Sequence, residues 1–228
     1  MRLITSYSQL LLRRFSGSLE GDALRCVDCI EQGARRMQQL LTDLLTYAQI
    51  SADDGADYDC VDLNLVFQKA LQNCKSAIED TKAHVTSEEL PTVYGRETHF
   101  VELFQNLIGN AVKYSGKEYA PRVHVSAAST DGVWRIAVAD NGIGIAPEHH
   151  RKIFGAFKRL HGKEIAGTGM GLAICQRVIE RYGGQIWVES QVNQGATFYC
   201  TLPLTKSVTP LSAAPLPAAE TISIGLGL

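Results

Sequence analysis

Apolar residues in the first fifty positions recur at helical spacing. Between residues 2 and 15, Leu3, Tyr7, Leu10 and Leu11 share one helical face. After Gly21 a longer run alternates spacings of three and four, as in a coiled-coil seam. Its members are Leu24, Val27, Ile30 or Glu31, Ala34, Met37, Leu41, Leu44 or Leu45, and Ala48. We expect an antiparallel helical hairpin that dimerises into a four-helix bundle, the alternative being a hairpin packed on the rest of its own chain.

The pattern changes after residue 51. Residues 52–57 are acidic, glycine-bearing and aperiodic, which predicts a linker between a hairpin at residues 1–51 and a second domain at 58–204. In that domain strands are expected at 58–62, 83–87, 90–94, 121–129, 133–139, 185–190 and 196–202, and helices at 63–79, 98–114, 147–154 and 172–182. Because the later strands are joined as hairpins, the expected fold class is α+β, with helices on one face of a mostly antiparallel sheet. Residues 205–228, rich in Ala, Pro, Leu and Ser, predict a disordered tail.

Two glycine-bearing segments organise the second domain. Residues 140–145 (Asp-Asn-Gly-Ile-Gly-Ile) follow a predicted strand, and residues 167–174 (Gly-Thr-Gly-Met-Gly-Leu-Ala-Ile) lead into a predicted helix. Glycines let the backbone approach a ligand closely, and the N–H groups of a helix start attract anions. The pair favours a nucleotide with its base against Asp140 and its phosphates on the second loop. Two tight turns without a ligand are the alternative.

A polar stripe interrupts the apolar helix predicted at residues 98–114. Glu102, Asn106 and Asn110 are spaced by four and therefore share one face. A solvated face is the alternative, but such faces usually carry Lys and Glu, and Asn is a poor helix former. Oxygen ligands from a carboxylate and amides suit Mg²⁺, which also retains substrate phosphates.

Composition narrows the possible partners and location. The 228 residues are 45% hydrophobic and 20% charged, with a net charge of −2, which is typical of a soluble globular protein and gives no electrostatic reason to expect nucleic acid. No apolar run approaches the ~20 residues that span a bilayer, so membrane insertion by this chain is not expected. The Cys26–Cys29 pair lies inside a predicted helix without a second such pair or a nearby His, so all six cysteines are interpreted as free thiols in a reducing cytoplasm.

Four motifs follow one another along the second domain, in the order and at the spacing that one known family shows. Residues 106–114 resemble an N box, 140–144 a first glycine box, 153–161 an F box and 167–174 a second glycine box. Together with the helical hairpin, they make residues 2 to about 204 resemble the sensor histidine kinases of two-component systems, and within them the phytochrome-like and cyanobacterial-type members.

The resemblance implies a Bergerat-type α/β sandwich that binds ATP and Mg²⁺. Asp140 would accept a hydrogen bond from the adenine amino group, and Asn106 would ligate Mg²⁺. Glu102 would serve as a general base or as an acid in the metal's outer shell, and Arg159 would contact the γ-phosphate. The other residues implied to surround the nucleotide are Asn110, Lys113, Tyr114, Gly142, Gly144, Gly167, Thr168, Gly169, Gly171 and Thr197, the last through its hydroxyl.

Two departures from the family pattern stand out. Relatives usually have Asp where this chain has Arg96, a difference expected to change a helix cap. The acceptor His and its acidic neighbour would align before residue 1. The six histidines of the chain all fall in the ATP-binding part, at positions 84, 99, 124, 149, 150 and 161.

The expected function is the ATP-binding catalytic core of a cytoplasmic histidine kinase. It would transfer the γ-phosphoryl group of ATP to a His outside this chain and on to an Asp of a response-regulator receiver domain, as a homodimer through residues 1–51. This chain alone would not autophosphorylate. The alternative is a nucleotide-binding and dimerisation module that regulates a partner kinase. A gyrase- or chaperone-like ATPase, with Glu102 activating water, is disfavoured by the heptad hairpin.

Overall fold

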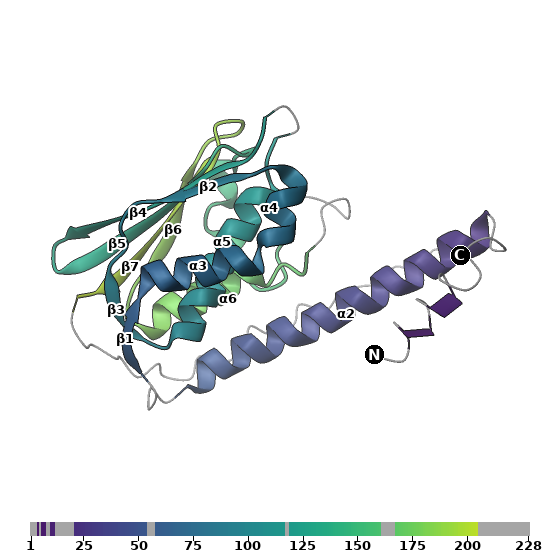
Figure 1. Cartoon of the computed structure of the whole chain (residues 1–228), viewed down its shortest axis with the longest axis horizontal. Coiled ribbons are helices and arrows are strands. Elements are labelled where there is room, and N and C mark those ends of the chain that lie inside the picture. The colour runs from purple at the N-terminus through teal and green to yellow at the C-terminus, as the bar shows by residue number, and fades with distance from the viewer. Residues whose placement is uncertain are drawn as a thin grey trace.

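The protein combines a long helix with an α/β body (Figure 1). The computed structural model describes residues 4, 6, 7, 10, 11, 21–53, 58–116, 119–160 and 167–204. Helix α2 spans Asp22–Ala52. The body contains β1 (Asp59–Asp62), α3 (Leu63–Asn73), α4 (Lys75–Thr81), β2 (His84–Ser87), β3 (Thr92–Gly95), α5 (Glu97–Lys113), β4 (Arg122–Thr130), β5 (Val133–Asp140), the 3₁₀ turns η1 (Pro147–His149) and η2 (Lys152–Phe154), α6 (Gly171–Arg181), β6 (Ile186–Ser190) and β7 (Ala196–Pro203).

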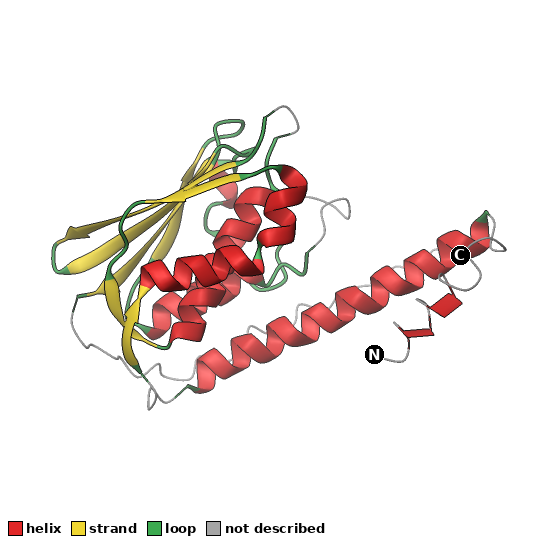
Figure 2. Ribbon diagram, viewed as in Figure 1, coloured by secondary structure: helices red, strands yellow, loops and turns green. Residues whose placement is uncertain are grey.

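The body is a two-layer sandwich. Five strands form one sheet in the order β2-β4-β5-β7-β6, in which β2 pairs parallel with β4 and the other neighbours pair antiparallel. Helices α3 to α6 lie on one side of this sheet (Figure 2), and β1 and β3 form a separate two-stranded ribbon. The predicted α+β class, with helices on one face of a mostly antiparallel sheet, is confirmed.

Helix α5 is the centre of the core. Its apolar residues Phe100, Leu103, Phe104, Leu107 and Ile108 are at most 2% exposed, because α3 and α6 pack on either side of it and the sheet lies beneath. Its remaining stripe stays half-buried and polar. The core therefore fixes the helix that carries the candidate metal-binding side chains.

Two predicted helices have a different form in the structure. The helix expected at residues 63–79 is divided into α3 and α4 at Cys74, whose φ of −91° and ψ of 2° leave the helical region. Cys74 is buried beside α5, and the break lets Ile78 also pack against the core, a tertiary effect that the apolar period does not reveal. The helix expected from Pro147 to Phe154 is two short 3₁₀ turns.

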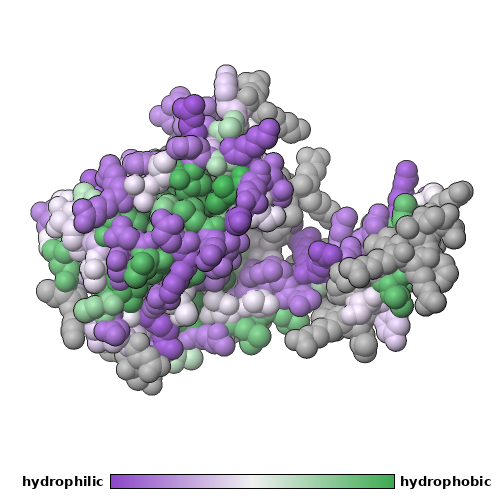
Figure 3. All heavy atoms as spheres, in the orientation of Figure 1, coloured by the Kyte–Doolittle hydropathy of each residue, from purple (hydrophilic) through white to green (hydrophobic). Residues whose placement is uncertain are grey.

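Helix α2 runs unbroken for 31 residues and leaves several seam residues exposed, namely Ile30, Met37, Leu41, Leu44 and Leu45. It ends one residue inside the predicted linker, with Asp53 as its cap. Figure 3 shows apolar patches on the body and along the arm that α2 forms. Within the described ranges, no helix is both long and apolar enough to cross a membrane.

Some predicted segments lie outside the described residues. Of the helix expected at residues 2–15, only positions 4, 6, 7, 10 and 11 are described, and these are helical. Linker residues 54–57, His161 and the predicted tail at 205–228 also lie outside the described part of the chain.

Candidate nucleotide-binding site

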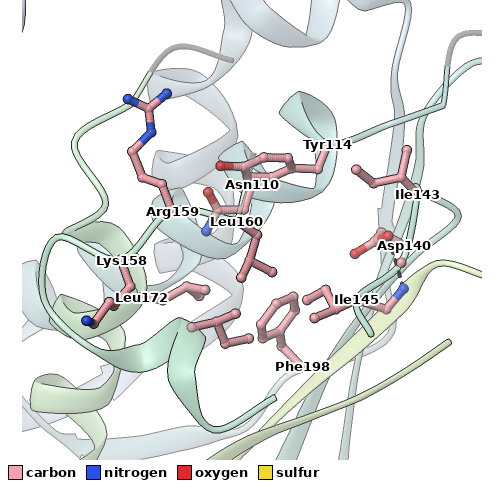
Figure 4. A pocket seen from close by; sticks show the side chains of 13 residues that line it. Asn110, Tyr114, Asp140, Ile143, Ile145, Lys158, Arg159, Leu160, Leu172 and Phe198 are labelled. Carbon is pink, nitrogen blue, oxygen red and sulfur yellow. Dashed lines mark hydrogen bonds between the residues drawn. The ribbon is translucent and has the colours of Figure 1, made fainter. Parts of the chain in front are cut away.

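A mainly apolar pocket opens between the ends of β5 and β7, helix α5 and the segment after η2 (Figure 4). The space inside it, counted together with the open solvent at its mouth, is about 600 Å³. Its lining residues are Asn110, Tyr114, Asp140, Ile143, Gly144, Ile145, Ile153, Lys158, Arg159, Leu160, Leu172, Ala196 and Phe198. Apolar walls around few polar groups suit a planar heterocycle.

Asp140 is the acid of this pocket. It is the last residue of β5, and its Oδ1 accepts hydrogen bonds from the N–H groups of Gly142 (2.8 Å) and Ala196 (3.2 Å). Burial raises the pKa of the Asp140 carboxyl above its ordinary value, and the two backbone hydrogen bonds act in the opposite direction. Because these N–H groups fix the carboxylate, it is oriented to accept a hydrogen bond from a ligand amino group.

The glycines after β5 are required by close contacts within the protein. A Cβ on Gly142 would lie 2.6 Å from the carbonyl oxygen of Tyr114. Gly144 has a φ of +69°, and its Cβ would lie 1.9 Å from the carbonyl oxygen of Gln191. Because neither position carries a side chain, the loop can pack closely against these neighbours and form the pocket wall.

A more polar pocket continues from the apolar one. The two share Asn110, Tyr114, Ile153, Lys158 and Leu172. The polar pocket adds Glu102, Gln105, Asn106, Gly109, Lys113, Gly167, Thr168, Gly169 and Gly171 from the body, and Gln39 and Asp43 from α2. The result is one cleft with an apolar half and a polar half, as a base and its phosphates require.

The helix stripe predicted to bind metal faces the polar half. Asn106 Nδ2 donates to the side-chain Oε1 (3.1 Å) and to the backbone O (2.9 Å) of Glu102. Asn106 Oδ1 points toward the start of α6, where a Cβ on Gly171 would lie only 2.5 Å away. Burial raises the pKa of the Glu102 carboxyl; the bond from Asn106 lowers it, and the charge of Asp43 raises it further. One amide and one carboxylate oxygen beside an open cleft fit Mg²⁺.

The second glycine segment forms the opposite wall. A Cβ on Gly167 would lie 2.5 Å from Lys113 Nζ, so the backbone passes directly over this ammonium group. Gly169 has a φ of +79°, and its Cβ would lie 2.8 Å from the carbonyl oxygen of Lys158. Helix α6 starts two residues later. Two lysines and a helix start make this half attractive to an anion.

The structure brings nearly all the predicted site residues to this cleft. The prediction for Thr197 is wrong. Side chains alternate along β7, so Ala196 and Phe198 line the pocket while Thr197 faces the other side of the sheet. The Thr197 hydroxyl therefore does not face the apolar pocket, contrary to the expectation. Arg159 lines the pocket, with its guanidinium directed away from Asp140 (Figure 4).

Sequence reasoning missed several lining residues. Strand alternation on β7 was the available signal for Ala196 and Phe198. No sequence signal pointed to Gln39 and Asp43, because they reach the cleft only through the way α2 packs against the body.

Comparison with known proteins identifies the part of the body from α5 to β7. The family model described as histidine kinase-, DNA gyrase B-, and HSP90-like ATPase matches residues 95–206. This domain belongs to that ATPase family. Its match begins just before α5 and ends just after β7, and so contains every lining residue of the cleft except Gln39 and Asp43 of α2.

The chain is also homologous to histidine kinases beyond the ATPase domain. It is 42% identical over 202 residues to cyanobacterial phytochrome A of Nostoc sp., a match covering 88% of this chain and 26% of that protein. It is 37% identical over 175 residues to the adaptive-response sensory kinase SasA of Thermosynechococcus vestitus, covering 74% and 45%. The chain thus spans about a quarter of the phytochrome and under half of SasA.

A solved structure shares the fold. Full-length ShkA in complex with AMPPNP matches with a TM-score of 0.66 and 26% identity, covering 94% of this chain and 45% of that one. The likeness extends across α2 as well as the ATPase domain.

Proposed function

We propose that this chain is the ATP-binding catalytic core of a sensor histidine kinase. The observation that carries the proposal is one cleft in which the Asp140 carboxylate faces an apolar pocket and the Asn106, Lys113 and glycine-loop groups face its polar extension. The match to the ATPase family and to the kinase SasA supports it, as does the adenine nucleotide AMPPNP in ShkA.

In this proposal Asp140 accepts a hydrogen bond from the adenine amino group, and Ile143, Ile145 and Phe198 enclose the ring. Gly167, Thr168, Gly169 and Gly171 shape the wall beside the phosphates. Lys113 and Arg159 supply positive charge. Such phosphoryl transfer depends mainly on positioning and on charge neutralisation.

The metal would be held on α5. Asn106 Oδ1 would ligate Mg²⁺, with Glu102 orienting Asn106 through the 3.1 Å hydrogen bond. When bound, the ion would neutralise charge on the phosphate oxygens. The raised pKa of Glu102 suits a group that accepts or holds a proton in the cleft.

The phosphoryl acceptor is proposed to be a His outside this chain, because residues 1–51, the expected dimerisation hairpin, carry no histidine. From there the group would pass to an Asp of a response-regulator receiver domain. We place this chemistry in the cytoplasm and in a homodimer whose subunits meet through the exposed stripe of α2.

The experiment that tests this function is transfer from γ-labelled ATP. The chain is compared with a version extended before Met1 by a helical segment bearing a histidine and an acidic neighbour. Acid-labile label is expected on the extended chain only, and Asn106→Ala is expected to abolish it. Gln68→Ala, which removes an exposed amide of α3 outside the cleft, is the matched control.

Label on the unextended chain would contradict the placement of the acceptor. If the extended chain binds ATP but takes up no label, the regulatory-module alternative is favoured over a kinase.

A further inference from the structure

Helix α2 contributes a wall to the polar half of the cleft. Gln39 and Asp43 line it together with Glu102, Asn106 and Thr168, although α2 lies outside the ATPase domain. We propose that Asp43 is a positioning residue that couples the binding of nucleotide phosphates to the docking of α2 on the ATPase domain. The inference rests on the proposed function and adds a means by which the helix and the nucleotide influence each other.

The coupling has a continuous path of hydrogen bonds. Thr168 Oγ1 donates to Asp43 Oδ2, and Gln39 Nε2 donates to Asp43 Oδ1 at 2.8 Å. The N–H of Met170 in turn donates to Thr168 Oγ1 at 3.2 Å. Because Met170 immediately precedes α6, the phosphate-side loop is held in the conformation in which its threonine reaches α2.

The charge of Asp43 determines whether the docked helix strengthens or weakens phosphate binding. Asp43 and Glu102 place two carboxyl groups in the same pocket, and the charge of Asp43 contributes to the raised pKa of Glu102. Phosphates bring further negative charge to the wall that Asp43 contacts. Lys113 and Lys158 attract phosphates there whether or not α2 is docked, since both belong to the body. Among the residues that line the cleft, Asp43 is therefore the charged one that α2 carries. Its negative charge repels phosphates and so opposes their binding.

The end of α2 is anchored separately. Arg177, 7% exposed on α6, donates from Nε to Ser51 Oγ at 2.8 Å and lies over the Tyr47 ring at 5.8 Å. At the cap of the helix, Asp53 pairs with Arg96 at 3.0 Å. Loss of the contact between Asp43 and Thr168 would thus release the middle of α2 while these contacts keep its end in place.

The test compares ATP with adenosine, which lacks phosphates. Asp43→Asn keeps the shape of the side chain and removes its charge. We expect it to tighten ATP binding roughly fivefold at low salt, with a smaller gain at high salt, because screening weakens the repulsion. Adenosine affinity is expected to stay unchanged. Asp22→Asn removes an exposed carboxylate at the far end of α2, roughly 30 Å along the helix, and serves as the control.

ATP affinity is measured by calorimetry, adenosine affinity by NMR titration, and folding by the urea midpoint. Gln39→Ala is a second variant, expected to shift ATP affinity in the same direction by less. An Asp43→Asn protein that binds ATP as the wild type does, or more weakly, would overturn the inference. So would an equal shift for ATP and adenosine. A wild-type chain that binds neither ligand would instead overturn the proposed function, and the inference with it.

Discussion

Arg96, the residue expected to change a helix cap, also contacts the end of α2. It is the N-cap of α5 but makes no side-chain cap hydrogen bond. Its Nη2 lies 3.0 Å from Asp53 Oδ1, at the end of α2. His99 Nε2 lies 3.5 Å from the other Asp53 oxygen, and His99 Nδ1 lies 2.8 Å from the hydroxyl of Tyr182. Arg96 thus joins α2 to the start of α5, a role that no local sequence pattern predicts.

His99 is expected to make stability depend on pH. Burial lowers its pKa to about 4, with Asp53 opposing this shift and Arg96 and Arg181 adding to it. Between pH 6.5 and 4 the unfolded chain therefore binds a proton that the folded chain does not. The free energy of unfolding should fall as pH drops through this window, by on the order of 3 kcal/mol.

Urea midpoints at several pH values measure this effect. His99→Gln, which cannot titrate, should show a flatter profile between pH 6.5 and 4 than the wild type. Parallel profiles for the two proteins would exclude His99 as the source.

At the scale of elements, the sequence was most informative where local turn chemistry decides the structure. Asp131 and Gly132 have φ of 52° and 78°, and Asn193 and Gly195 have φ of 64° and 77°, so these turns suit residues that tolerate positive φ. Both predicted hairpins are found there. The break at Cys74 and the outward face of Thr197 were missed, because each depends on packing or strand register and not on local propensity.

Helix α2 has two faces with different surroundings. Asp43, Tyr47 and Ser51 contact the ATPase domain, whereas the stripe through Met37 and Leu41 points away from it and is exposed. The packing of α2 on its own chain therefore leaves the predicted seam available for contact with a second subunit. An exposed apolar stripe of this extent is typical of an interface.

The exposed apolar stripe of α2 predicts a homodimer. A charged residue placed in this stripe should weaken the dimer. Leu41→Glu should raise the dimer dissociation constant by roughly tenfold or more, because it places a charge in an apolar interface. Gln32→Glu, an exposed position on the opposite side of the helix, should change it little. Sedimentation equilibrium gives both constants. A wild-type chain that remains monomeric at high concentration would contradict the dimer.

At the scale of the whole molecule, the cleft is assembled from both parts of the chain. The body supplies the apolar pocket and the glycine loop before α6, and most of the residues in both lie in the sequence motifs. Helix α2 supplies Gln39 and Asp43, and Asp43 meets Thr168 across a separation of 125 residues. Motif spacing describes contacts within one domain, so the contribution of α2 required the structure.

We propose above all that Asp140 recognises an adenine base at the end of this cleft. Calorimetric titration of the chain with ATP and GTP, each with Mg²⁺, tests it most directly, because a carboxylate accepts from the amino group of adenine but faces a carbonyl oxygen in guanine. ATP should bind and GTP should not. Asp140→Ala should weaken ATP binding about 10- to 100-fold, the cost of losing one charge-assisted hydrogen bond. Asp131→Asn in the exposed β4–β5 turn should leave it unchanged. Equal binding of ATP and GTP, or ATP binding that survives Asp140→Ala intact, would contradict the account.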